Sequence, residues 1–257
     1  MKENKYMEIP REELLEETKR FKEWSGPVLV KLFTDSEYGL LSLGSGGLLK
    51  YRGRYFAITN EHVIRNVDKE KRKSEIIIPY KDKNNKDIKV KIIDDEEDKE
   101  NDFAALEICE TSVKLMKNHW FLDESYMEKN VLDYIDRSNV VFLHGFPWTE
   151  TNIDTANRIV DMTTLPYTTF VNEYNDYSDI LELIADSKGI SEFGTEINLP
   201  SFAGMSGSLV YGYYRNELIP YKFLGILSYW EAKTNILGVF PISEVINFLD
   251  TKFFITD

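Results

Sequence analysis

The sequence is poor in cysteine, and it lacks both a signal segment and long apolar runs. Cys109 is the only cysteine among 257 residues, so the chain cannot form an internal disulfide. Residues 1–5 carry charges and no apolar signal core. No apolar run approaches the ~20 residues that a membrane-spanning helix needs. We therefore expect a protein of the reducing cytoplasm with no membrane partner.

Basic residues and metal-ligating clusters are also scarce. The chain has 31 Lys and Arg against 44 Asp and Glu, which gives a net charge of −13 and disfavours a nucleic-acid partner. His62, His119, His144 and Cys109 show no ligand spacing typical of zinc. The acidic stretch 94–101 lacks the glycine and alternating ligands of a calcium loop, so we expect a solvated loop there. We expect no metal and no cofactor.

What the chain does contain is typical of a globular β protein. Hydrophobic residues make up 42% and aromatic residues 13% of the chain. Residues 11–24 show the spacing of an amphipathic helix, and Ser243 precedes a second helix at 244–253. Between them lie many short β-type runs with turn signals, which predict β-barrel halves. We expect five segments: 1–26 a helical extension, 27–115 a first β-barrel, 116–135 a linker, 136–241 a second β-barrel and 242–257 a C-terminal helix.

A glycine-flanked serine turn, Gly204-Met205-Ser206-Gly207-Ser208, precedes the apolar run 209–211. Glycines on both sides of the serine permit backbone conformations that are closed to residues with a Cβ. Such a turn can direct a hydroxyl and backbone N–H groups at one point, as acyl transfer requires. Taken alone, the turn is more typical of an ordinary loop than of a nucleophile.

Two other stretches supply the groups that a nucleophilic serine needs. His62 directly follows the strand-like run 55–59, and histidine has the pKa range of a base that can take the serine proton. Asp102 opens the strand-like run 102–108, and an acid is needed to hold the imidazole in the correct tautomer. The chain order His, Asp, Ser is one of several that carry this chemistry.

These blocks resemble the trypsin-like serine peptidases of the chymotrypsin fold, in their disulfide-free bacterial form. Residues 59–63 (Thr-Asn-Glu-His-Val) match the histidine block, residues 102–106 (Asp-Phe-Ala-Ala-Leu) the aspartate block and residues 204–208 the serine block. Weaker matches are found at 44–47, 225–228 and 238–240. The resemblance runs from about residue 27 to the C-terminus and implies a mainly β protein with two six-stranded antiparallel β-barrels and a helix at each end.

The resemblance also implies a role for each site residue. Ser206 is expected to attack the scissile carbonyl, His62 to act as general base and Asp102 to orient it, with the N–H groups of Gly204 and Ser206 as the oxyanion hole. The expected partner is a peptide or protein substrate, bound as an added strand along residues 228–230, Ser228, Tyr229 and Trp230. Ser228 is also expected to hydrogen-bond near Asp102, whereas His119 and His144 are interpreted as structural.

The sequence departs from the family pattern at the residues that govern activation and specificity. Met205 replaces the aspartate that pairs with a new N-terminus in digestive members, so we expect no activation of that kind. Pro200 lies near the expected floor of the specificity pocket, Trp230 at its mouth and Gly238 at the opposite wall. No carboxylate is present to meet Lys or Arg, so an uncharged and small residue is expected before the cut.

Two other functions compete with a restricted serine endopeptidase. A gated or inactive domain that binds peptides or protein partners fits the bulky Trp230, and a regulatory partner would remain to be identified. An esterase of the α/β-hydrolase type is disfavoured, because those enzymes place His after Ser and show Gly-x-Ser-x-Gly.

Overall fold

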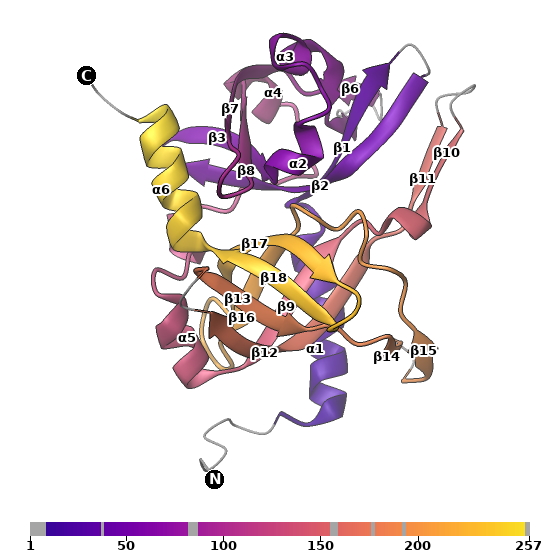
Figure 1. The fold of residues 1–257 in the computed structure, drawn as a ribbon, viewed down its shortest axis with the longest axis vertical. Coiled ribbons are helices and arrows are strands. Elements are labelled where there is room, and N and C mark those ends of the chain that lie inside the picture. Colours follow the sequence, from indigo (N-terminus) through magenta and orange to yellow (C-terminus); the bar gives the residue numbers. More distant parts are fainter. Residues whose placement is uncertain are drawn as a thin grey trace.

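The computed structural model describes residues 9–36, 39–81, 87–154, 159–175, 178–191 and 194–254. Two β units lie one above the other, with one long helix beside each (Figure 1). One continuous cluster of buried apolar side chains runs through both units, so they share a core.

The N-terminal unit is a half-barrel, a six-stranded antiparallel sheet in the order β4-β1-β2-β3-β8-β7. Its strands are β1 (Leu29–Ser36), β2 (Gly39–Tyr51), β3 (Arg54–Thr59), β4 (Ile76–Ile77), β7 (Ile92–Asp98) and β8 (Phe103–Ile108), with a side hairpin of β5 (Pro79–Lys81) and β6 (Asp87–Lys89). Glycines in β2 let the second unit approach closely. A Cβ on Gly47 would lie 2.2 Å from Leu209 Cγ, so only glycine fits at this contact.

The C-terminal unit is a closed barrel in the order β12-β13-β18-β17-β16-β9. Its strands are β9 (Val140–Gly145), β12 (Leu165–Asn175), β13 (Ile180–Ile184), β16 (Leu209–Tyr213), β17 (Tyr221–Glu231) and β18 (Ile236–Pro241). Two hairpins project from it, one formed by β10 (Thr151–Asp154) and β11 (Ile159–Met162), the other by β14 (Lys188–Ile190) and β15 (Glu196–Asn198).

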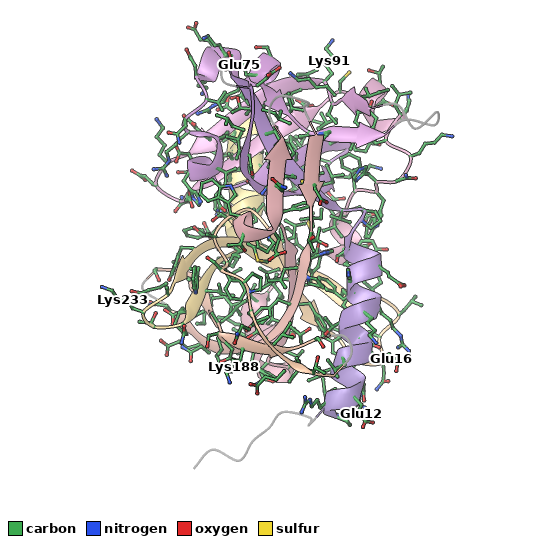
Figure 2. All side chains as sticks on the ribbon, turned by 90° about the vertical axis from the view of Figure 1, so that its right-hand side faces the viewer. Glu12, Glu16, Glu75, Lys91, Lys188 and Lys233 are labelled. Atoms are coloured by element: carbon green, nitrogen blue, oxygen red, sulfur yellow. The ribbon has the colours of Figure 1, made fainter. Side chains whose placement is uncertain are left out.

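The two long helices are exchanged between the units. Helix α1 (Arg11–Ser25) precedes the half-barrel in the chain but packs on the closed barrel, where Phe21 is fully buried against Phe142, Tyr211 and Tyr221. Helix α6 (Ile242–Phe253) follows the closed barrel but packs on the half-barrel, where Phe248 and Phe253 contact Phe103 and Phe56. Figure 2 shows α1 along the side of the closed barrel, with Glu12 and Glu16 on its outer surface.

Short helices fill the remaining connections. They are α2 (Glu61–Ile64), η1 (Lys69–Lys71), α3 (Arg72–Glu75), α4 (Glu110–Val113), η2 (Glu124–Tyr126), α5 (Val131–Arg137) and η3 (Trp148–Glu150). The stretch between the units is held by both, because Leu122 forms a bridge with Leu49 and Met127 forms one with Phe223. No helix in the described ranges has the length and apolar character needed to cross a bilayer.

The predicted fold class is confirmed, as are the two terminal helices in the residues described; residues 1–8 and 255–257 lie outside them. The expected solvated loop at 94–101 is wrong for residues 94–98, whereas residues 99–101 form an exposed turn. Residues 94–98 belong to β7, which pairs with β8 along its whole length. Asp95 and Glu97 can lie in this strand because the buried Arg72 pairs with them, at 3.6 and 2.6 Å.

Candidate active site

His62 and Asp102 lie at neighbouring ends of two paired strands. Strand β3 ends at Thr59, which pairs with Ala104 of β8, so the residue after β3 and the residue before β8 meet at one edge. His62 follows in α2, and its backbone N–H donates to Asp102 Oδ1 at 3.0 Å. Its ring Nδ1 lies 2.8 Å from Asp102 Oδ2 and 3.0 Å from Oδ1. The imidazole is therefore held in one orientation by the carboxylate.

Asp102 is fixed by both its backbone and its carboxylate. Its φ of 55° is unusual for a residue with a Cβ but is tolerated by aspartate. Its carbonyl accepts from Asn60 Nδ2 and Glu61 N at 3.1 and 3.2 Å. Burial alone would raise the pKa of the Asp102 carboxyl, but hydrogen bonds from His62 and Ser228 outweigh burial and lower that pKa. The carboxylate is therefore ionised at neutral pH.

This charge state decides the tautomer of His62. An ionised carboxylate only accepts hydrogen bonds, so Nδ1 of His62 must be the donor. In the neutral imidazole, Nε2 is then left with its lone pair. A nitrogen in that state can take a proton from a hydroxyl.

The loop that carries Ser206 is braced by Ser45 of β2, on the half-barrel. Ser45 Oγ donates to Gly204 O at 2.9 Å and accepts from Phe146 N at 3.0 Å, while Ser45 N donates to Ser206 O at 3.1 Å. Gly207 has a φ of +87°, and a Cβ there would lie 2.1 Å from Ser45 O, so glycine is required. The serine turn is thus locked from the opposite unit.

Ser206, His62 and Asp102 line a common cavity of about 330 Å³. The Ser206 hydroxyl donates to Ser228 O at 3.3 Å. Within the described part of the chain, no hydrogen bond joins Ser206 to His62. Catalytic hydrogen bonds are often long in the absence of substrate.

Two backbone N–H groups of the loop are left available for an anion. Ala203 O accepts from Trp148 N at 2.7 Å and Met205 O accepts from Ser208 N at 2.9 Å. Because a trans peptide directs C=O and N–H to opposite sides, the N–H groups of Gly204 and Ser206 point away from those contacts. Neither N–H donates to an acceptor in the residues that the structure describes. This arrangement can stabilise a developing oxyanion.

One side of the cavity is largely aromatic. Phe202, Tyr229 and Trp230 line it, with Ala203, Leu227 and Ser228. Phe202 is 4% exposed, and its ring contacts Trp230 at 5.8 Å between centroids. No carboxylate other than Asp102 faces the cavity among the described residues.

Two residues expected in this pocket, Pro200 and Gly238, do not line it. Pro200 does not line the pocket, but Phe202, which follows it by two residues in the same loop, does. A bulge in β17 after Leu227 pairs Tyr229 with Gly238, and the Tyr229 ring covers Gly238 so closely that a Cβ would lie 2.1 Å from Tyr229 Cε1. The expected opposite wall is therefore already occupied.

Of the other two histidines, His144 is buried and His119 is half-buried. His144 is 3% exposed and lies beside Ser25, and burial lowers the pKa of its imidazole to about 3. Burial also lowers the pKa of His119, whose Nδ1 contacts Pro27 O. Both therefore stay neutral at pH 7. The described residues contain no group of three His, Cys, Asp or Glu side chains placed to hold a metal ion.

Three residues behind the site were missed by sequence reasoning. Ser45 falls in a block whose alignment to the family is loose, and Phe202 is typical of any core aromatic. Lys31 is 2% exposed, its Nζ lies 3.4 Å from Phe146 O, and burial lowers its pKa to about 8. The one signal in the sequence was the charged Lys31 within the otherwise apolar run 28–33.

Comparison with known proteins identifies the fold. No family model matches the sequence, and no curated protein matches it. The crystal structure of Deg5, a trypsin-like serine protease, superposes with a TM-score of 0.54 at 17% identity, covering 94% of this chain and 95% of that chain. At this identity the likeness establishes architecture alone. The chain has the fold of the trypsin-like serine proteases.

Proposed function

We propose that the chain is a serine endopeptidase of restricted specificity. One observation supports this best: His62 Nδ1 lies 2.8 Å from Asp102 Oδ2, and both residues share a cavity with Ser206. Structural and catalytic histidines are both common, but an ionised aspartate at Nδ1 with a serine across the same cavity is the geometry of a general base.

In the proposed reaction, each group has one task. Ser206 Oγ leaves Ser228 O, transfers its proton to His62 Nε2 and attacks the substrate carbonyl carbon. The N–H groups of Gly204 and Ser206 donate to the resulting oxyanion. The His62 imidazolium, stabilised by Asp102, then protonates the leaving amine, and a water molecule hydrolyses the acyl-enzyme by the same steps.

The free edge of β17 at residues 228–230 is an argument for a peptide substrate. Strand β16 pairs with β17 from Tyr221 to Ile226, whereas β18 pairs with it on the other side up to Glu231. Residues 228–230 therefore have one side without a strand partner among the described residues. A peptide that added a strand here would place its backbone beside Ser206.

A gated, peptide-binding domain is the second candidate. It is favoured by one observation, the hydrogen bond from Ser206 Oγ to Ser228 O. In that state the hydroxyl is directed away from its base, and a ligand or partner would be needed to turn it.

Labelling with a fluorophosphonate probe distinguishes the two functions. We expect the wild-type protein to be labelled and Ser206→Ala and His62→Ala to lose labelling, since loss of either group costs on the order of 10⁶ in turnover in a working triad. Ser74→Ala and His119→Gln, away from the cavity, serve as matched controls and should be labelled normally. A folded wild-type protein that is not labelled would contradict the peptidase and favour the gated domain.

A further inference from the structure

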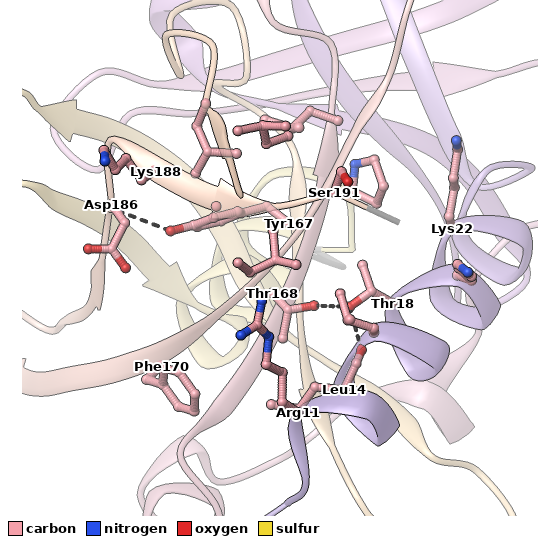
Figure 3. Close-up of a pocket in the computed structure, with 18 residues that line it drawn as sticks. Arg11, Leu14, Thr18, Lys22, Tyr167, Thr168, Phe170, Asp186, Lys188 and Ser191 are labelled. Carbon is pink, nitrogen blue, oxygen red and sulfur yellow. Dashed lines mark hydrogen bonds between the residues drawn. The ribbon is translucent and has the colours of Figure 1, made fainter. Parts of the chain in front are cut away.

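A groove separate from the catalytic cavity runs along α1. Helix α1 forms one wall, the first half of β12 forms the floor, and the β14–β15 hairpin forms the other wall (Figure 3). Its volume is about 490 Å³, within the range of ligand-binding sites, and it shares no lining residue with the catalytic cavity.

The groove is lined by apolar side chains that remain exposed. Leu14, Leu15 and Leu165 lie along it. Phe170, Ile190 and Ile197 also line it and are 40%, 37% and 39% exposed. Contiguous exposed apolar residues with a polar rim are typical of binding sites.

The rim of the groove is positive, although the chain carries a net charge of −13. Arg11, Lys19 and Lys22 lie along the α1 side and Lys188 on the hairpin, against one acid, Asp186. Lys188 pairs with Glu196 at 2.7 Å. Arg11, Lys19 and Lys22 form no ion pair with a described carboxylate.

Three of the five acids of α1 form ion pairs away from the groove. Glu16 and Glu17 pair with Arg20, and Glu13 pairs with Arg215. None of these three acids lines the groove. Three of the four cations of α1 therefore lie at the groove, whereas Arg20 and its acidic partners lie away from it.

The spacing of these cations indicates the kind of ligand. Arg11 and Lys22 are eleven residues apart, which is roughly 16 Å along a helix. In Figure 3, Arg11 extends from the first turn of α1 toward Thr168, and Lys22 lies at the far end of the helix wall. An amphiphile with one charged head would meet cations at one end only. A ligand with carboxylates at both ends and apolar groups between them matches the whole groove.

We propose that this groove is a second peptide site, which binds acidic segments with apolar anchor residues. An extended peptide rises ~3.3 Å per residue, so acidic residues about five positions apart reach both ends. Binding here does not depend on the proposed catalytic reaction.

The groove lies directly behind the catalytic cavity. Tyr167 lines the groove, and its ring contacts Phe202 at 5.0 Å, which in turn contacts Trp230. Leu199 of the groove precedes the Ser206 loop by a few residues in the chain. A peptide in the groove therefore contacts Tyr167, and Tyr167 packs against Phe202 in the wall of the specificity pocket.

Fluorescence anisotropy with a defined probe tests this site. The probe is a fluorescein-labelled, capped hexapeptide with a glutamate at each end and leucines between them, titrated with the Ser206→Ala protein so that cleavage plays no part. We expect saturable binding that weakens at least fivefold in a Lys19→Gln, Lys22→Gln variant. Lys117→Gln with Lys129→Gln removes the same charge elsewhere and should bind like the parent.

A second variant tests the groove without altering any residue of α1. Ile190→Ser with Ile197→Ser alters exposed residues of the hairpin, and we expect it to lose binding with an unchanged circular dichroism spectrum. The proposal is overturned if the parent shows no saturable binding, or if the Lys117, Lys129 control weakens as much as the groove variant. It is also overturned if dodecanoate binds in calorimetry while the peptide does not, because the groove would then be a lipid site.

Discussion

Ser228 Oγ donates a hydrogen bond of 2.8 Å to Asp102 Oδ2, the same oxygen that meets His62 Nδ1. Ser228 belongs to the closed barrel, whereas Asp102 and His62 belong to the half-barrel. The orientation of the imidazole therefore depends on contact between the two units. Ser45, which holds the Ser206 loop from the half-barrel, makes the reciprocal connection.

We predict that Ser228→Ala lowers the rate of fluorophosphonate labelling by about tenfold to a hundredfold. A hydrogen bond to a charged group contributes about 1.5–3 kcal/mol, and 1.4 kcal/mol corresponds to a factor of ten in rate. Second-order labelling rates measure this effect, with Ser74→Ala as the control. An unchanged rate in Ser228→Ala would mean that Asp102 is held by His62 alone.

Trp230 is predicted to restrict the residue before the cut. The wild-type protein should favour small uncharged residues, because Trp230 and Phe202 line the pocket and the Tyr229 ring occupies the space beside Gly238. Trp230→Gly should raise kcat/KM for a bulky residue relative to alanine by at least tenfold, as read from a peptide library. Trp148→Ala, exposed and outside the cavity, is the control. Cleavage by the wild type mainly after Lys or Arg would refute this prediction.

We predict that stability falls on mild acidification because of His144. Burial lowers the pKa of His144 to about 3 in the folded protein, against 6.5 in the unfolded chain. The unfolded state therefore binds more protons below pH 6.5, and the contribution of His144, complete above that pH, is lost as pH falls toward 3. Between pH 6.5 and 5 the loss is about 2 kcal/mol.

Urea unfolding at pH 7.5 and pH 5 measures this loss. His144→Gln should show a difference between the two pH values smaller by about 2 kcal/mol, since other titrating groups are common to both proteins. An equal pH dependence in wild type and variant would assign the acid sensitivity to other groups.

The protein is predicted to need no N-terminal cleavage for activity. Met205 is fully buried and carries no charge, so it offers no partner to a newly formed amino terminus. Peptide mapping of probe-labelled protein should recover the α1 segment Arg11–Ser25. Labelled molecules that all begin after Ser25 would contradict this prediction.

Phe21→Ala is predicted to destabilise the fold by about 3–5 kcal/mol, the usual cost of deleting a buried phenylalanine. Phe21 has no exposed surface and contacts aromatic rings from three strands of the closed barrel. Leu218→Ala, at a site that is 99% exposed, should change the free energy of unfolding by less than about 0.5 kcal/mol. Equal unfolding midpoints for the two variants would show that α1 adds little stability.

Local patterns in the sequence were sufficient to find the residues that meet at the cavity. His62, Asp102 and Ser206 each lie beside a strand with a clear β pattern, and the resemblance of their three blocks to one family grouped them in one site. The fold class followed from the same strands and from the resemblance. The role of each residue stays a prediction until labelling tests it.

What could not be predicted depends on contacts between distant segments. Phe202 lines the pocket because the loop before Ser206 turns its ring toward Trp230, and nothing in the residues 200–203 encodes that direction. The Tyr229 ring covers Gly238 because of a bulge in β17, which shifts the register by one residue. The acidic residues of β7 are paired with Arg72, a buried side chain that comes some twenty residues earlier in the chain.

The exchange of helices between the two units determines the order in which the molecule can be completed during synthesis. Helix α1 leaves the ribosome first, but Tyr211 and Tyr221, which enclose Phe21, are made about 190–200 residues later. At 5–20 residues per second, α1 waits roughly ten to forty seconds for its binding surface. The half-barrel likewise waits for α6, which follows every other helix of the described residues in the chain. The closed barrel therefore keeps an uncovered apolar face until Tyr211 and Tyr221 have been made, and the half-barrel keeps one until α6 has been made.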